Sequence, residues 1–465
     1  TSANRHVFMQ NYSIVGFVAF GSFKKSIRIA ELPVYQIESV EDLYRLIPRN
    51  NLDGILFPNI KVVQQERDRL IRYCEQTSLK TLVVPEMEEL RGGNMKRSVR
   101  EIRIEDLLGR EEININLGEI GNLLKGKTVL VTGAAGSIGS EICRQLAHFQ
   151  IKRLVCFDSA ETPMHNLRLE LEEKFKDLNF VPVIGDVRNL DRVDYVFRNW
   201  LPQVVFHAAA YKHVPLMEEN PCEAIRTNVF GTRVMADAAV AYGVEKFVMI
   251  STDKAVNPTN IMGCSKRLAE IYVQSLSIAI GRGEVSGHTR FITTRFGNVL
   301  GSNGSVIPRF RDQIAQGGPV TVTHPDIIRY FMTIPEACRL VLEAGTLGKG
   351  GEIFIFDMGE PVKIADLARR MIELSGLQVN KDIEIKYTGL RPGEKLYEEL
   401  LSKKENTKET PHEKIRVAAV REYAYTDVVE HINLLAELSL RVQILPMVKE
   451  MKSFVPEFKS QNSQF

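Results

Sequence analysis

The sequence has no marked excess of either charge and no long apolar run. Lys plus Arg (60) nearly balance Asp plus Glu (58), and the net charge of +2 creates no general field for nucleic acid or a membrane surface. No run of about 18 apolar residues is present, so we expect this chain not to span a bilayer. Nucleic acid is not an expected partner, and any anionic ligand must be bound locally.

The six cysteines lack the paired spacing of a metal site. Cys143 and Cys156 lie in apolar runs typical of a buried helix and a buried strand. We therefore expect reduced thiols in a cytosolic environment, and no metal. The chain begins Thr1-Ser2-Ala3 without Met, and we expect it to be an excised piece of a longer protein.

At 465 residues the chain is long enough for two or three domains. We predict an N-terminal α/β domain over residues 1–90, a polar linker over 91–126 and a catalytic domain over 127–465. A smaller substrate-binding lobe is expected mainly from residue 297 onward, where the pattern becomes irregular and rich in Gly and Pro. The polar tail from Lys459 is expected to fray.

The N-terminal domain is predicted to be a degenerate Rossmann-like unit. Apolar strands at 14–18, 53–58 and 79–85 alternate with helices at 40–47 and 62–73, which favours a parallel sheet. Three phenylalanines crowd its first turn, where a pyrophosphate would otherwise lie, so we expect a structural or docking role. They are Phe17, Phe20 and Phe23.

From Thr128 onward apolar strands alternate with amphipathic helices. This pattern is typical of a doubly wound parallel sheet covered on both faces, in which ligands bind at the carboxyl ends of the strands. The predicted strands are 129–131, 153–157, 180–183, 204–206 and 246–250, and the predicted helices are 138–148, 163–175, 224–242 and 266–281.

A glycine-rich turn follows the first of these strands. Gly133, Gly136 and Gly139 allow a tight turn that brings backbone N–H groups and the start of a helix, at Ser137 and Ile138, up to a pyrophosphate. Asp158 ends the next strand, where a carboxylate accepts both ribose hydroxyls of NAD and repels the extra phosphate of NADP. The pattern therefore predicts NAD as the cofactor, and Ala208, Ala209 and Ala210 offer the small side chains needed beside it.

An acid and an amine follow the strand that Ser251 closes, whose carboxyl end should face the nicotinamide. Thr252, Asp253 and Lys254 come directly after it. Removal of water across two carbons needs one group to take a proton and another to give one, and Asp253 and Lys254 can divide these roles. An ordinary solvated loop pair is the alternative interpretation.

Lys266 is expected on the first turn of the next helix, where its ammonium could hold the nicotinamide ribose. In the short-chain dehydrogenase/reductase family a catalytic Tyr stands four residues before this Lys, but here the position holds Met262, which cannot relay a proton. A water or Thr252 would have to do so. An inactive reductase is the alternative that this substitution raises.

The remaining signals suit a nucleotide-linked substrate. A Gly-rich loop and short helix are expected over 295–310, and Leu390-Arg391-Pro392-Gly393-Glu394-Lys395 forms a second candidate loop. Arg391 suits a diphosphate, because Arg presents a planar fork of donors, and Glu394 suits sugar hydroxyls.

Together these residues resemble the extended short-chain dehydrogenases that modify nucleotide sugars. The closest resemblance is to the membrane-anchored UDP-N-acetylglucosamine 4,6-dehydratases of capsule, O-antigen and protein-glycan pathways, a branch that carries Met in place of the Tyr. The resemblance extends over the N-terminal domain, 104–110, 132–139, 210–215, 251–254 and 391–394. It implies further cofactor contacts at Ser159, Asp186 and Val187, the latter two at the adenine, and substrate contacts at Lys212, His213, Asn298, Ser305, Val306 and Arg309.

The resemblance implies oxidation at C4 of a UDP-linked amino sugar, loss of water from C5 and C6, and return of the hydride to C6. Lys254 would take the C5 proton and Asp253 would protonate the departing hydroxyl, or the two roles could be exchanged. It also implies transmembrane helices in a missing N-terminal portion and a location on the cytoplasmic side of the bacterial inner membrane. We expect a homo-oligomer of unspecified size. A UDP-sugar 4-epimerase, or a catalytically dead nucleotide-sensing or scaffold protein, are the alternatives.

Overall fold

A computed structural model describes residues 13–20, 27–50, 52–77, 79–84, 100–102, 104–107, 113, 115–399 and 406–465. The chain divides into two compact units. The larger contains Glu112–Arg309, Thr323–Ile364 and Tyr387–Phe465, and the smaller contains Thr1–Glu111, Phe310–Val322 and Ala365–Lys386.

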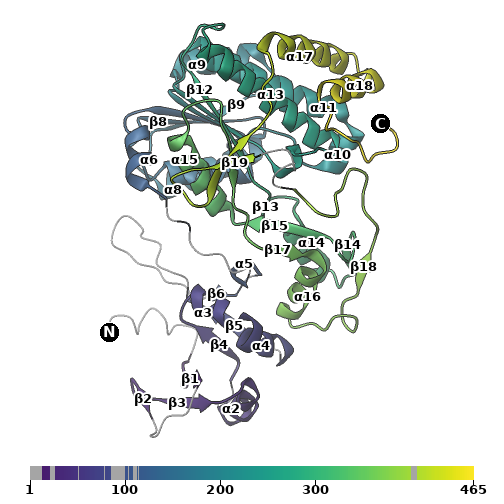
Figure 1. Ribbon diagram of the computed structural model, residues 1–465. Helices are drawn as coiled ribbons and strands as arrows, with labels where there is room; N and C mark the ends of the chain where they lie inside the picture. The colour runs from purple at the N-terminus through teal and green to yellow at the C-terminus, as the bar shows by residue number, and fades with distance from the viewer. Residues whose placement is uncertain are drawn as a thin grey trace. The chain divides into compact units, whose positions relative to one another are not determined.

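The larger unit is built on a nine-stranded sheet of order β19-β20-β16-β12-β11-β10-β7-β8-β9. Figure 1 labels β8, β9, β12 and β19 of this sheet. The strands from β9 to β16 pair in parallel, whereas β20 and β19 add antiparallel at one edge. The predicted doubly wound fold is confirmed. The strands are β7 (Thr128–Thr132), β8 (Arg153–Asp158), β9 (Phe180–Ile184), β10 (Val204–His207), β11 (Lys246–Ile250), β12 (Arg290–Arg295), β16 (Ile353–Phe356), β19 (Asn406–Glu409) and β20 (Ile415–Ala419).

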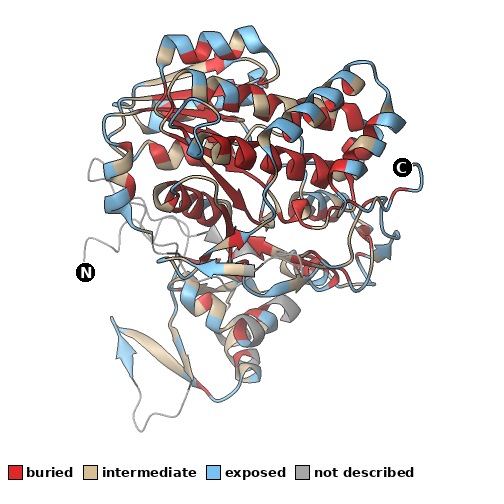
Figure 2. Cartoon of the chain, turned by 45° about the horizontal axis from the view of Figure 1, so that its top comes forward, coloured by how far each residue is buried: buried red, intermediate tan, exposed pale blue. Residues whose placement is uncertain are grey.

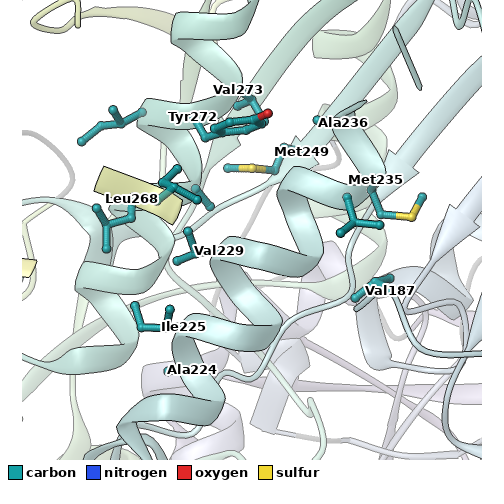
Figure 3. Close-up of a cluster of buried hydrophobic side chains, with 14 of the residues drawn as sticks. Val187, Ala224, Ile225, Val229, Met235, Ala236, Met249, Leu268, Tyr272 and Val273 are labelled. Carbon is teal, nitrogen blue, oxygen red and sulfur yellow. The ribbon is translucent and has the colours of Figure 1, made fainter. Parts of the chain in front are cut away.

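Both faces of this sheet are covered because successive side chains on a strand point to opposite sides. On β7, Leu130 joins one apolar cluster, while Val129 and Val131 join the other. The first cluster includes α9 (Leu190–Trp200), η3 (Ile225–Gly231), α12 (Thr232–Ala241), α13 (Ile261–Gly281), α17 (Tyr425–Leu440) and α18 (Ile444–Phe454). Figure 3 shows part of this cluster, with labelled side chains from η3, α12 and α13. The second includes α6 (Leu117–Leu124), α7 (Ser137–Leu146), α8 (Glu161–Lys174) and α15 (Ile334–Leu347). Figure 2 shows the central strands buried.

The helix predicted to begin at Lys266 begins earlier, and this expectation was wrong. Asn260 has extended backbone and its side chain accepts a hydrogen bond from the Gly263 N–H, so it caps α13 and the helix starts at Ile261. Met262 therefore lies on the first turn and Lys266 on the second. The helix predicted over 224–242 is formed by α11 (Pro221–Ala224), the π-helical η3 and α12, after α10 (Val214–Glu219).

Residues after 297 build several parts of the molecule. In the larger unit, β13 (Asn298–Val299), β15 (Ile328–Met332) and β17 (Pro361–Lys363) form a small sheet, whereas α15, β16, β19 and β20 return to the main sheet. The remaining elements of this region are α14 (Val306–Ala315), β14 (Val320–Val322), which pairs with β18 (Ile385–Tyr387), and α16 (Ile364–Leu374).

The N-terminal part of the smaller unit has two small sheets rather than the single parallel sheet predicted. In each, one pair of strands is parallel and one is antiparallel. The strand pairs at 28–37 lacked a strong apolar pattern and were not expected. The sheets are β1 (Phe17–Phe20), β3 (Leu32–Ile37) and β2 (Arg28–Ile29), then β4 (Gly54–Phe57), β5 (Lys80–Val83) and β6 (Arg100–Glu101).

The helical segments of this part are η1 (Val40–Asp42), α2 (Leu43–Asn50), α3 (Ile60–Gln65), η2 (Arg67–Ile71), α4 (Arg72–Thr77) and α5 (Ile104–Leu107). Phe23 of the predicted first turn lies outside the described residues, and so do residues 91–99 of the predicted linker.

The C-terminal tail is docked, which corrects the expectation that it frays. The backbone N–H groups of Lys459 and Gln461 donate to the carbonyls of Pro258 (3.0 Å) and Thr259 (2.9 Å). The buried side chain of Asn462 donates to Glu218 Oε2 at 2.8 Å. All six cysteines are buried, and none of them forms a disulfide. Within the described residues no helix is long and apolar enough to cross a membrane.

Candidate active site

Three neighbouring strands bring the predicted cofactor and catalytic segments to one edge of the sheet. Strands β7, β10 and β11 are adjacent and parallel, so their carboxyl ends lie side by side. Gly133 follows β7, Ala208 follows β10 and Ser251 follows β11. In a parallel α/β sheet this edge is where ligands bind.

The glycine turn is packed too closely for side chains. Gly133 has a φ of +64°, and a Cβ there would lie 2.7 Å from backbone atoms of Ala208 and Ala209. A Cβ on Gly139 would lie 2.0 Å from the Gly133 carbonyl oxygen. Gly136 is the N-cap of α7, so the first N–H groups of this helix point out of the turn, as they do at anion sites.

Asp158 is tied to the glycine turn. Its Oδ2 accepts from the Ala135 N–H (3.0 Å) and its Oδ1 from the Ala160 N–H (2.9 Å), while Ser159 is exposed. Beside this region lies a cavity of about 460 Å³ whose lining includes Gly136 and Ser137. The structure thus brings together the predicted turn and the acid at the end of β8.

The predicted adenine residues point in different directions. Val187 is 5% exposed and packs in the apolar cluster that Figure 3 shows. Asp186 accepts hydrogen bonds from Arg188, which also bonds Glu223 at 2.7 Å. Burial alone would raise the pKa of Asp186, but the contacts with Arg188 hold this pKa below its usual value.

Thr252, Asp253 and Lys254 form a compact hydrogen-bonded group on η4 (Asp253–Ala255) and its N-cap. Asp253 is 1% exposed, and its Oδ1 accepts from the Thr252 hydroxyl (2.8 Å) and from Lys254 Nζ (3.0 Å). Its Oδ2 is buried and has no hydrogen-bond partner among the described residues. Lys254 Nζ also lies 3.3 Å from Asn298 Oδ1 and 3.4 Å from Glu398 Oε1.

The surroundings of Lys254 favour its charged form. Burial alone would lower the pKa of this amine, but the carboxylates of Asp253 and Glu398 raise it above the usual value, against an opposing contribution from Arg329. Lys254 is therefore an ammonium in the resting site, able to donate a proton. Within this pair, the Asp253 carboxylate is the group that can accept a proton.

Helix α13 presses against this turn. A Cβ on Gly263 would lie only 2.2 Å from the Lys254 carbonyl oxygen, so the first turn of the helix and the turn that carries Asp253 touch through their backbones. Met262, beside Gly263, is 4% exposed and belongs to the apolar cluster. The position at which the resemblance implies a tyrosine in other dehydrogenases thus holds a packed thioether.

Lys266 lies behind the same strand end. Its Nζ donates to the Ile250 carbonyl at 2.7 Å, and burial lowers its pKa to about 8, partly offset by Glu270. Nearby His207 is fully buried between Thr132 (2.7 Å) and Thr232 (3.0 Å). Burial and the charge of Lys266 lower the pKa of His207 to about 3, so this imidazole is neutral.

A buried ionic network that the sequence reading missed supports Ser251. The Ser251 hydroxyl donates to Glu270 Oε1 at 2.6 Å, and Arg295 binds both oxygens of that carboxylate at 2.8 and 2.6 Å. Although burial would raise it, the Arg295 contacts keep the pKa of Glu270 below its usual value. The signal was available, because residues 266 and 270 are four apart and share one face of a helix.

The predicted substrate residues after β10 meet the loop after β13. Lys212 Nζ donates to Ser302 Oγ at 3.3 Å, and a Cβ on Gly304 would lie 2.6 Å from His213 Cε1. Buried Asn228 holds this segment through both backbone groups of Tyr211. Burial lowers the pKa of Lys212.

The second predicted loop is held by groups that the sequence did not indicate. Glu394 accepts from Thr323 (3.2 Å), from Arg329 (3.4 Å) and from the Arg391 N–H (3.2 Å), while Arg391 is exposed. The Gly393 carbonyl accepts from Asn260 at 3.0 Å. This loop is therefore hydrogen-bonded to the segment between Lys254 and Met262.

Ser305, Val306 and Arg309 lie at the start of α14 and just before it. The buried Ser305 hydroxyl has no hydrogen-bond partner within the described part of the chain, and the Ser137 hydroxyl accepts from the Asn303 N–H at 3.2 Å. The glycine turn and this loop are therefore neighbours. No group of three or more His, Cys, Asp or Glu among the described residues could hold a metal ion.

The protein family of this chain follows from a comparison of its sequence with known families. The family described as "Polysaccharide biosynthesis protein" matches residues 129–420, more than half of the chain. This chain belongs to that family. A "Capsular polysaccharide biosynthesis protein CapD" of Staphylococcus aureus is 47% identical over 391 residues, covering 84% of this chain and 64% of the relative. The chain thus spans just under two thirds of that protein's length.

Other similar proteins have narrower overlap. A "UDP-glucose 4-epimerase" of Rickettsia rickettsii is 39% identical over 286 residues, which are 61% of this chain and 80% of the relative. Among solved structures, Pen from Bacillus thuringiensis aligns with a TM-score of 0.59 and 38% identity over 65% of this chain and 91% of Pen.

DesIV from Streptomyces venezuelae, a dTDP-glucose 4,6-dehydratase solved as a double mutant with NAD, aligns with a TM-score of 0.50 and 21% identity. It covers 56% of this chain and 84% of DesIV, a likeness that shows the fold alone. The fold is that of the extended short-chain dehydrogenases.

Proposed function

We propose that this protein catalyses the NAD-dependent 4,6-dehydration of UDP-N-acetylglucosamine to a 6-deoxy-4-keto sugar. The observation that carries the proposal is the buried Asp253–Lys254 pair, at the same sheet edge as the glycine turn. The resemblance to the dehydratase branch with Met in place of Tyr supplies the substrate.

The residues present fit NAD. The turn at Gly133 and Gly139 leaves no room for side chains, and α7 presents its N-terminal N–H groups. Asp158 would accept the ribose hydroxyls, and Ala209 and Ala210 would flank the cofactor. When bound, NAD would supply the acceptor that takes hydride from C4 and returns it to C6.

Oxidation at C4 requires loss of the hydroxyl proton. Thr252 would orient this hydroxyl, with Lys266 and an ordered water completing the path, because Met262 has no proton to exchange. Thr252 Oγ1 donates to Asp253 and accepts from the Lys254 N–H at 3.4 Å, which leaves one lone pair for this hydroxyl.

Elimination then uses the pair directly. The 4-keto group acidifies the C5 proton, which Asp253 would take, and the Lys254 ammonium would protonate the hydroxyl that leaves C6 as water. Asp253 would return its proton to C5, and the proton lost from the C4 hydroxyl balances the one that leaves in water. Of the two role assignments, this one agrees with the raised pKa of Lys254.

The nucleotide would be held by the loops around this pair. Arg391, exposed at its turn, and Arg309 suit the diphosphate, whereas Lys212, His213 and Asn298 would bind sugar hydroxyls. Glu394, Ser305 and Val306 complete the proposed contacts. Action at the cytoplasmic side of the inner membrane and a homo-oligomeric state stay predictions.

A 4-epimerase is the second candidate, favoured by the relative of that name. It shares the fold and C4 oxidation but needs no group to expel the C6 hydroxyl. Incubation with NAD and UDP-N-acetylglucosamine, followed by mass spectrometry, separates the candidates. Loss of one water is expected. An epimer of unchanged mass would indicate the epimerase, and binding without turnover would indicate a scaffold; either contradicts the proposal.

A further inference from the structure

Glu398 places a second carboxylate at the Lys254 ammonium. The Glu398 side chain is 3% exposed, and its Oε1 lies 3.4 Å from Lys254 Nζ. Its Oε2 is buried with no hydrogen-bond partner in the described part of the chain. Burial of an ionised carboxylate is costly unless it is paired, so its contact with Lys254 is a built feature of the site.

Arg329, on β15, holds Glu398 in place. Its Nε lies 3.7 Å from Glu398 Oε1, and its other nitrogens donate to the backbone carbonyls of Lys395 (2.8 Å) and Leu396 (3.2 Å). The Ile328 N–H also donates to the Leu396 carbonyl. The backbone that carries Glu398 is therefore fixed from the same strand that holds its carboxylate.

The adjacent acid behaves differently. Glu399 is 43% exposed, lies 3.6 Å from Lys395 Nζ and accepts from Asn257 Nδ2 at 2.9 Å. It makes no ion pair with Lys254 in the described structure. The two neighbours in sequence thus provide a contact and its matched control.

Five charges alternate in sign through this site. Asp253, Lys254, Glu398, Arg329 and Glu394 follow one another at contact distances of 3.0, 3.4, 3.7 and 3.4 Å. From the other packed elements, β13 presents the neutral amide of Asn298 and α13 presents the backbone at Gly263. Among the described residues, the charged groups that act on the ammonium are Asp253, Glu398 and Arg329.

We propose that Glu398 is a positioning residue for Lys254: fixed by Arg329, its carboxylate holds the Lys254 side chain in place and in its charged form for proton donation. Only the transfer of the Lys254 proton to substrate rests on the proposed function, because the contact between Glu398 and Lys254 exists without substrate. It also links the loop at Arg391 to the elimination pair, because Glu398 follows that loop directly.

The test is an NMR titration of the lysine side chains in the full chain, labelled with 13C and 15N at lysine. Lys254→Arg assigns the signal. An opposite charge within about 4–6 Å changes a pKa by about one to three pH units. Glu398→Gln is expected to lower the Lys254 pKa by about that amount, Glu398→Asp by less because it keeps the charge, and Glu399→Gln not at all.

An unchanged Lys254 pKa in Glu398→Gln, or an equal decrease in Glu399→Gln, would overturn the proposal. If Glu398→Gln does not fold, the graded decrease in Glu398→Asp decides in the same way. Neither measurement needs turnover. Absence of water loss in the wild-type protein would remove the proposed function and leave this titration to decide about Glu398.

Discussion

Gly263 and Lys254 touch through their backbones: a Cβ on Gly263 would lie 2.2 Å from the Lys254 carbonyl oxygen. The first turn of α13 therefore sets the position of the turn that carries Asp253. A backbone carbonyl cannot move aside as a side chain can, so an added methyl group must displace the turn that carries Asp253.

Gly263→Ala is expected to lower turnover by about 100-fold, the scale of a displacement of about 1 Å at a reacting centre. Gly281, at the other end of the same helix, has nothing within 4 Å of its Cβ position. Gly281→Ala is expected to leave turnover unchanged and to stabilise the protein by roughly 0.5–1 kcal/mol. Steady-state kinetics and urea unfolding check both variants; equal turnover in them would contradict the contact.

Because Lys266 is buried, the free energy of unfolding should depend on pH. Its pKa falls from 10.5 to about 8 on folding, chiefly through burial. Between these pH values the unfolded chain binds more protons than the folded one, so stability from this group rises with pH. Below pH about 8 the buried amine is destabilising.

Lys266→Met removes this dependence. The free energy of unfolding of the variant, minus that of the wild type, is expected to fall by up to about 3 kcal/mol from near-neutral pH to above the unfolded pKa. Urea unfolding without cofactor measures this difference. A difference that stays constant or rises with pH would rule out the buried amine as its source.

The C-terminal tail predicts a stability effect far from its own position in the sequence. Asn462 donates to Glu218 Oε2, while Glu218 Oε1 accepts from the Ile261 N–H at 2.7 Å, at the start of α13. Asn462→Ala leaves a buried carboxylate oxygen without its partner, at a cost of about 1–3 kcal/mol in urea unfolding. The exposed neighbour provides the control, since Ser463→Ala should change stability by less than about 0.5 kcal/mol. Equal effects would mean that the tail contact is not stabilising.

Asp158 predicts cofactor preference. Asp158→Asn is expected to weaken NAD binding by about 10- to 100-fold, the scale of a lost hydrogen bond to a charged group, and to weaken NADP binding less. Titration calorimetry with each nucleotide measures both affinities. Asp177→Asn, at an exposed position, serves as the control. If the affinities for NAD and NADP fell equally, Asp158 would not be the group that contacts the ribose.

Periodicity predicted most of the larger unit because its signals are local. Strand β7, the glycine turn and α7 follow each other in sequence, as do Thr252, Asp253 and Lys254. The sequence pattern predicts the start of α13 too late, at Lys266, because it does not mark Ile261 and Met262 as helical after the cap at Asn260. The sequence pattern predicts one N-terminal sheet instead of two, because short strands such as Arg28–Ile29 give no apolar alternation.

The rest of the site depends on contacts between residues far apart in the sequence. Glu398 and Glu399 are chemically identical neighbours, and only the fold of the segment that Arg329 holds directs the first to Lys254. The docking of Asn462 on Glu218 joins residues 244 positions apart. A polar composition predicted fraying there, but hydrogen bonds to buried groups decide the outcome.

The central claim is that Asp253 and Lys254 carry out the elimination after C4 has been oxidised. The most direct measurement is single turnover of Asp253→Asn with NAD and UDP-N-acetylglucosamine, following cofactor reduction by absorbance and product by mass spectrometry. We predict that the variant accumulates reduced cofactor and the 4-keto sugar without losing water, whereas the wild type loses water. Water loss by Asp253→Asn within about two-fold of the wild-type rate would contradict the account.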